Sequence, residues 1–136
     1  MRFVDTNVLL YAISRDPDEQ AKAEIANNLL RDRDLALSVQ VLQEFYVQAT
    51  RSSRQDAISH SQAADLVTAF ARFPVQETTL ELANAAVAAS SRFAISYWDA
   101  AILEAARAMG CNQLLSEDLS HDHDYEGVVV TNPFLA

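Results

Sequence analysis

Phe3-Val4-Asp5-Thr6-Asn7-Val8-Leu9-Leu10 is the stretch around which the rest of this chain is arranged. Its apolar start is typical of a buried strand and stops at a carboxylate, a hydroxyl and an amide. We expect Asp5 to stand at the carboxyl end of that strand, the edge at which open α/β sheets bind their ligands. The alternative reading of Asp5-Thr6-Asn7 is an N-cap for the following helix. A functional site therefore requires further residues that converge on Asp5.

Length and composition set the class of protein. A chain of 136 residues, half of them hydrophobic, fits one domain over residues 1–136 and buries roughly two thirds of its unfolded surface without disulfides. The single cysteine, Cys111, favours a reducing compartment. No apolar run approaches the roughly 20 residues that a membrane helix needs. We expect a soluble, cytoplasmic protein with no membrane partner.

The charge balance opposes one obvious function. Ten basic and 19 acidic residues give a formal net charge of −9, which discourages nucleic-acid binding by bulk attraction. Bound cations could cancel some of the carboxylates, or the few arginines could gather at one site. The remaining possibility is that the acidic surface repels nucleic acid and the protein binds something else.

Strand-like and helix-like segments alternate along the chain. Short apolar runs predict strands at 3–4, 35–37, 74–76, 113–115 and 128–130. Helices are predicted at about 17–31 after the N-cap Asp16, 39–49 after Ser38, 61–72, 79–92 from the capping-box spacing of Thr78 and Glu81, and 97–109 after Ser96, with 51–61 as a polar loop. Strands separated by helices imply an α/β fold with a parallel sheet covered on both faces. The only glycines, Gly110 and Gly127, cannot build a GxGxxG turn or a P-loop, which excludes those phosphate cradles.

Four acidic residues occupy positions that a parallel sheet brings to one edge. Asp5 follows the first strand, Glu44 lies on the helix after the second, Asp99 opens the helix before the fourth, and Asp118 lies just beyond the fourth. Each has a simpler explanation when taken alone. Asp99 could cap its helix, Glu44 could be a solvated residue at the margin of its helix's apolar face, and Asp118 could be one of several acids in an acidic loop. The shared edge is what favours a site.

Clustered carboxylates cannot all stay ionised unless a cation joins them. Carboxylate oxygens without thiolates suit Mg²⁺ or Mn²⁺, and the implied reaction is hydrolytic phosphoryl transfer by metal-activated water. Four polar residues could orient the ligands or waters from behind: Thr6, Asn7, Ser38 and Ser116. Arg51 and Arg54, beyond Glu44, are candidates for binding substrate phosphates, although they could equally face solvent.

These same motifs resemble a known family. Val4-Asp5-Thr6-Asn7-Val8-Leu9-Leu10-Tyr11, Leu37-Ser38 with Gln43-Glu44-Phe45, Trp98-Asp99-Ala100-Ala101-Ile102 and Leu115-Ser116-Glu117-Asp118-Leu119 are similar to the motifs of PIN domains, and more narrowly of VapC-type toxins from bacterial toxin–antitoxin pairs. The likeness covers essentially the whole chain. It implies a PIN-like three-layer sandwich with a parallel sheet of about five strands.

The same resemblance implies a function, a cofactor and partners. It implies a Mg²⁺- or Mn²⁺-dependent ribonuclease that forms a homodimer and is inhibited by a small antitoxin whose tail enters the acidic site. Carried over by position, the catalytic and metal-binding quartet is Asp5, Glu44, Asp99 and Asp118. Asp122 is the alternative to Asp118 as the fourth acid.

Other readings stay open. A catalytically inactive PIN-like module would bind RNA or protein with the same fold. A haloacid dehalogenase-like phosphatase would use Asp5 as a nucleophile, but it needs a second Asp at the place of Asn7 and a lysine, of which Lys22 is the only one. The run His121-Asp122-His123-Asp124 could bind a transition metal, but adjacent loop residues rarely direct four ligands at one ion.

Overall fold

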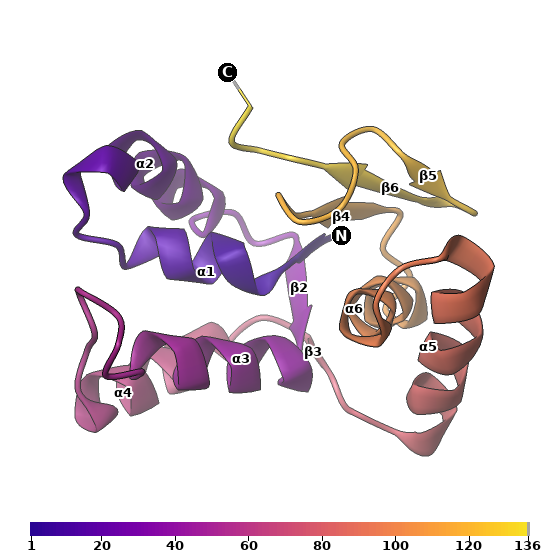
Figure 1. The fold of residues 1–136 in the computed structure, drawn as a ribbon, viewed down its shortest axis with the longest axis horizontal. Helices are drawn as coiled ribbons and strands as arrows, with labels where there is room; N and C mark the ends of the chain where they lie inside the picture. Colours follow the sequence, from indigo (N-terminus) through magenta and orange to yellow (C-terminus); the bar gives the residue numbers. More distant parts are fainter. Residues whose placement is uncertain (136) are drawn as a thin grey trace.

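The computed structural model describes residues 1–135, and within them helices flank a mixed, mostly parallel six-stranded sheet. In Figure 1 the helices α1 to α4 lie to the left of the sheet and the pair α5 and α6 lies to its lower right. The strands are β1 (Arg2–Val4), β2 (Leu35–Ser38), β3 (Val75–Gln76), β4 (Gln113–Leu115), β5 (Asp124–Tyr125) and β6 (Val128–Thr131). The helices are α1 (Thr6–Ala12), the short 3₁₀ helix η1 (Pro17–Glu19), α2 (Gln20–Leu29), α3 (Val39–Ala49), α4 (His60–Phe70), α5 (Leu80–Phe93) and α6 (Tyr97–Ala108).

The sheet has the strand order β3-β2-β1-β4-β6-β5. The first five strands in this order are parallel, so the α/β class and the five predicted strands are confirmed. At the centre, Phe3 of β1 pairs with Ala36 of β2 on one side and Leu114 of β4 on the other. All three side chains are fully buried, as expected for strands covered on both faces.

The sixth strand, β5, pairs antiparallel with β6 inside the segment that the sequence assigned to a loop. Glu126 and Gly127 connect the two strands, both with positive φ (52° and 100°). Two such residues form the tight turn whose twist matches a hairpin, and Gly127 adopts this conformation without steric cost. The hairpin therefore depends on a two-residue turn rather than on an apolar run.

Two helix starts differ from the prediction. Asp16 caps a 3₁₀ turn by accepting a hydrogen bond from the Asp18 N–H, and α2 follows only at Gln20. Thr79, not Thr78, caps α5, because its hydroxyl accepts the Leu82 N–H at 3.1 Å. The predicted caps of the other two helices are confirmed: Ser38 begins α3 and Ser96 begins α6.

The helices α5 and α6 pack closely through small side chains. Ala86 and Ala89 of α5 are buried against Ala100 and Ala101 of α6. This contact fixes the first turn of α6, which carries Asp99, beside the sheet edge. No helix in residues 1–135 is both long and apolar enough to cross a membrane.

Candidate active site

Asp5 directly follows β1 and is buried, with 4% of its surface exposed. It is the most buried of the four predicted acids. Its Oδ1 accepts the Thr6 N–H at 2.7 Å, which caps α1, and its Oδ2 accepts the Ser116 hydroxyl at 2.7 Å. The main-chain N–H of Asp5 donates to the carbonyl of Leu115 at the end of β4. The cap reading of Asp5 is therefore correct, and it coexists with the convergence that a site requires.

Burial dominates the electrostatics of Asp5. Desolvation raises its pKa to about 7, against the hydrogen bonds from Ser116 and Thr6, which favour the ionised form. The negative charges of Asp118 and Glu44 raise the pKa further. This influence shows that acids from three separate elements act on one another at this edge.

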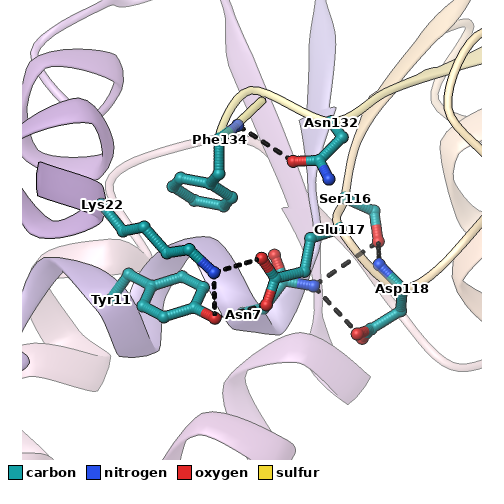
Figure 2. Close-up of polar contacts among 8 residues, drawn as sticks. All are labelled: Asn7, Tyr11, Lys22, Ser116, Glu117, Asp118, Asn132 and Phe134. Carbon is teal, nitrogen blue, oxygen red and sulfur yellow. Dashed lines mark hydrogen bonds and ion pairs between the residues drawn. The ribbon is translucent and has the colours of Figure 1, made fainter. Parts of the chain in front are cut away.

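Asp118 is held at the edge by Asn7 and Ser116, as Figure 2 shows. The Asn7 amide Nδ2 donates to Asp118 Oδ2 at 3.2 Å and weakly to Ser116 Oγ at 3.5 Å, and the Asp118 N–H donates to Ser116 Oγ at 3.1 Å. Asp122, the alternative fourth acid, is exposed as Asp118 is, but it lies 3.3 Å from His121 Nε2. Of the two candidates, the structure places Asp118 in the hydrogen-bond network of Asp5.

Glu44 is held from both sides. Its Oε2 accepts the Thr6 hydroxyl at 2.9 Å, and its Oε1 accepts the Gln40 amide at 2.7 Å. The same Gln40 amide donates to the carbonyl of Trp98 at 3.2 Å and so ties α3 to the first turn of α6. Ser38 positions Glu44 indirectly. Its hydroxyl accepts the Val41 N–H and so caps α3, the helix that carries Glu44.

Asp99 lies in the first turn of α6, where Ser96 accepts its main-chain N–H at 3.1 Å. Partial burial raises the pKa of its carboxyl, the Ser96 hydroxyl lowers it in part, and the charges of Asp118 and Glu44 raise it again. All four predicted acids thus act on a shared region of the sheet edge.

The four acids are near one another but do not form a closed cluster. Among residues 1–135, no three His, Cys, Asp or Glu side chains are placed closely enough to surround a metal ion. The donor set nevertheless fits Mg²⁺ or Mn²⁺, because it is made of carboxylate oxygens. Burial raises the pKa of Asp5 and Asp99 most, the neighbouring carboxylates raise it further, and a cation would offset both effects. A second sign is the buried Asn7 Oδ1, which has no hydrogen-bond partner within the described residues.

The two predicted arginines line different pockets. Arg51 is exposed just beyond α3 and lines a pocket together with Glu44. Arg54 is more enclosed, with its Nε 2.9 Å from Asp56 Oδ1, and it lines a cavity of about 160 Å³ that Asn7 also lines. The structure therefore does not gather the two arginines into one patch.

Three residues beside the site were not predicted, and Figure 2 shows them together. The hydroxyl of Tyr11 donates to Glu117, and Lys22 Nζ donates to the Tyr11 hydroxyl at 3.1 Å and to Glu117 Oε2 at 3.0 Å. The ring of Phe134 packs edge-on against Tyr11 at 4.8 Å. One signal was available in the sequence: Tyr11 follows Asn7 by four residues, which places both on one face of α1.

The histidine-bearing loop is used for folding. His121 Nδ1 accepts the Asn132 N–H at 2.9 Å, and the ring of His123 packs against Tyr125 at 4.3 Å. The two imidazoles thus make separate structural contacts. The His, Asp and Glu side chains of this loop, within residues 1–135, do not form a group that could hold a metal ion.

Comparisons with solved structures find the same fold. A toxin–antitoxin complex from Klebsiella pneumoniae is 20% identical with a TM-score of 0.71, covering 98% of both chains. The Mycobacterium tuberculosis toxin VapC20, reported as cleaving the sarcin–ricin loop, is 20% identical with a TM-score of 0.68, covering 87% of this chain and 90% of its own. DNA-bound VapBC from Salmonella typhimurium is 18% identical with a TM-score of 0.66, covering 95% of each chain.

At these identities the structural likeness shows a shared fold alone. No curated protein sequence matches the chain significantly. The family comparison is decisive, because the PIN domain model matches residues 2–123 and so includes every acid of the predicted quartet. The chain belongs to the PIN domain family.

Proposed function

We propose that this protein is a Mg²⁺- or Mn²⁺-dependent endoribonuclease and the toxin of a toxin–antitoxin pair. The observation that carries the proposal is the buried Asp5, whose pKa of about 7 is raised by burial and by the charges of Asp118 and Glu44 in a PIN domain. A buried carboxyl with further carboxylates beside it is easier to keep ionised when a cation is bound, as expected of a metal-dependent nuclease centre. Membership of the PIN family removes the haloacid dehalogenase-like alternative.

In this proposal Asp5, Glu44, Asp99 and Asp118 hold the metal. When bound, the ion supplies an activated water and stabilises the charge that develops on the cleaved phosphodiester. The other residues orient the acids: the Ser116 hydroxyl holds Asp5, the Thr6 hydroxyl and the Gln40 amide hold Glu44, and the Asn7 amide holds Asp118.

The negative net charge requires local cations for an RNA substrate. Arg51 and Arg54 are our candidates, and Lys22 is a third, since it donates to Glu117 one residue before Asp118. Arg51 lines a pocket together with Glu44, whereas Arg54 lines another cavity together with Asn7.

We also propose the partners and the setting. Solved structures of the same fold include toxin–antitoxin complexes, and a small antitoxin with a basic tail would complement the acidic site of this chain. An apolar groove of about 660 Å³ between α3 and α4, lined by Leu42, Tyr46, Val47 and Val67 among others, offers a seat for its apolar part. The protein is expected to be a cytoplasmic homodimer.

Cleavage mapping tests the function. Purified protein, freed of its antitoxin, is incubated with total cellular RNA and Mg²⁺ or Mn²⁺, and the new ends are sequenced. We expect cleavage at defined positions that leaves 5′-phosphate ends and stops with a chelator. Intact RNA under all metal conditions, together with RNA binding, would favour the alternative of a catalytically inactive binding module.

A further inference from the structure

Trp98 is the only tryptophan of the chain, and it stands exposed next to the site. It occupies the first turn of α6, directly before Asp99, with 65% of its surface open to solvent. The ring of Tyr97 packs edge-on against it at 4.9 Å, and the Gln40 amide donates to its carbonyl at 3.2 Å. A large aromatic side chain therefore lies next to the four acids with most of its surface exposed to solvent.

Trp98 forms one wall of a pocket of about 370 Å³ that contains a site acid. The other lining residues are Gln40, Gln43, Glu44, Val47, Gln48 and Arg51. The pocket thus combines an aromatic side chain, polar residues and an arginine next to Glu44.

A nucleotide of a single RNA strand matches this chemistry. A nucleobase stacks on an exposed aromatic side chain, amides contact its polar edge, and an arginine contacts the neighbouring phosphate. A base inside a duplex has both faces covered, so only an unpaired base can stack in this way. A protein partner fits Trp98 less well, because the larger apolar groove between α3 and α4 shares Gln43 and Val47 with this pocket but contains neither Trp98 nor Arg51.

We propose that Trp98 is a base-stacking residue, on which an unpaired nucleobase next to the cleaved phosphate of the RNA stacks. The proposal rests on the proposed ribonuclease function and adds to it a preference for single-stranded substrate at this position. Arg51 contacts a phosphate of the same strand. Trp98 binds the substrate and takes no part in the chemical step.

The single tryptophan makes the proposal directly measurable. We would record the tryptophan fluorescence of the full chain, in chelator so that RNA is not cut, during titration with single-stranded RNA and with the same sequence as a duplex. We expect saturable quenching by the single strand and little by the duplex. Unchanged fluorescence over a range in which labelled RNA binds would overturn the proposal.

Variants check that stacking contributes to affinity. Trp98→Ala is expected to weaken the binding of labelled single-stranded RNA about tenfold, in the range for loss of one base stack, and Trp98→Phe to restore part of it. Leu135→Ala, an exposed apolar change outside this pocket, should bind as the wild type does. Wild-type affinity in Trp98→Ala would refute the proposal, as would a Trp98 fluorescence that an antitoxin peptide quenches and single-stranded RNA does not. If Trp98→Ala fails to fold, the wild-type titration and Trp98→Phe decide.

The experiment separates this proposal from the ribonuclease function. Cleavage with Mg²⁺ but no quenching in chelator would leave the nuclease intact and remove the stacking role of Trp98. Quenching by single-stranded RNA, with no cleavage when Mg²⁺ or Mn²⁺ is added, would keep the stacking role of Trp98 and contradict the nuclease function.

Discussion

Asp5 serves the fold and the site with the same carboxylate. One oxygen caps α1 and the other accepts the Ser116 hydroxyl, while burial raises the pKa of the group to about 7. A residue with such a pKa is half ionised near neutrality, so its protonation would compete with the proposed metal binding. Two predictions follow from this single side chain.

The first prediction concerns stability against pH in metal-free protein. The folded pKa of about 7 lies above the ordinary value of 3.8, so the folded state binds the proton more tightly. The stabilisation is full below about pH 4 and is lost as pH rises through 7, by on the order of a few kcal/mol. Thermal melts in chelator should show the wild type losing stability over this range relative to Asp5→Asn. Parallel pH profiles of the two proteins would contradict the assignment.

The second prediction concerns Ser116, whose hydroxyl favours the ionised form of Asp5. In Ser116→Ala the pKa of Asp5 should rise further, since the hydrogen bond that lowers it is gone. RNA cleavage at neutral pH should fall about tenfold, as expected for a lost hydrogen bond to a charge, and recover at higher pH. Ser120→Ala, an exposed serine of the same loop, is the matched control. A loss that stays constant with pH would point to a steric cause instead.

The residues of this site differ in how far the sequence reveals them. Asp5 could be predicted because an apolar strand stops at it, and Asp99 because its helix has a clear start at Ser96. The contact of Lys22 with Glu117 could not, because it joins residues 95 positions apart and depends on how α2 packs beside the end of β4. A side-chain contact of this kind produces no periodic pattern in the sequence from which it could be predicted.

At the scale of elements, the site depends on how α3 and α6 are joined. Gln40 of α3 donates to both Glu44 and the Trp98 carbonyl of α6, so one amide connects two helices that carry acids. The strands were predictable because they are short apolar runs. The hairpin of β5 and β6 was not, because it rests on the backbone conformation of Glu126 and Gly127.

The third prediction tests this connection. Gln40→Met keeps the length of the side chain but removes the donor, and it should lower the free energy of unfolding by about 1 to 2 kcal/mol. Asn28→Met, an exposed amide on α2, is the matched control and should leave it unchanged within about 0.5 kcal/mol. Equal denaturant midpoints for the two variants would show that the amide does not join the helices.

At the scale of the whole molecule, the basic residues are mostly committed to the fold. Arg2 pairs with Asp32 and Asp34, and four further arginines bind main-chain or acidic partners: Arg54, Arg72, Arg92 and Arg107. This use of arginines explains how a chain of net charge −9 has few cations left for a substrate. Composition alone could not separate the structural arginines from the free ones.

The fourth prediction concerns the proposed homodimer. Leu80 and Val87 are 78% and 62% exposed and stand seven residues apart, on one face of α5. We expect the double variant Leu80→Ser/Val87→Ser to be monomeric by light scattering at concentrations at which the wild type is dimeric, since an apolar face favours association. Leu135→Ser, 56% exposed near the chain end, should stay dimeric. A dimer that survives the double change would exclude this face.

The most direct test of the central claim is metal-dependent cleavage of a single-stranded RNA by the four acid variants. Asp5→Asn, Glu44→Gln, Asp99→Asn and Asp118→Asn should each cleave at least about a hundredfold more slowly than the wild type with Mg²⁺ or Mn²⁺, because each removes a metal-binding charge. Asp65→Asn, an exposed acid on α4, should cleave at the wild-type rate. Cleavage by Asp5→Asn that equals the wild type would contradict the claim that these acids form a metal-dependent nuclease site.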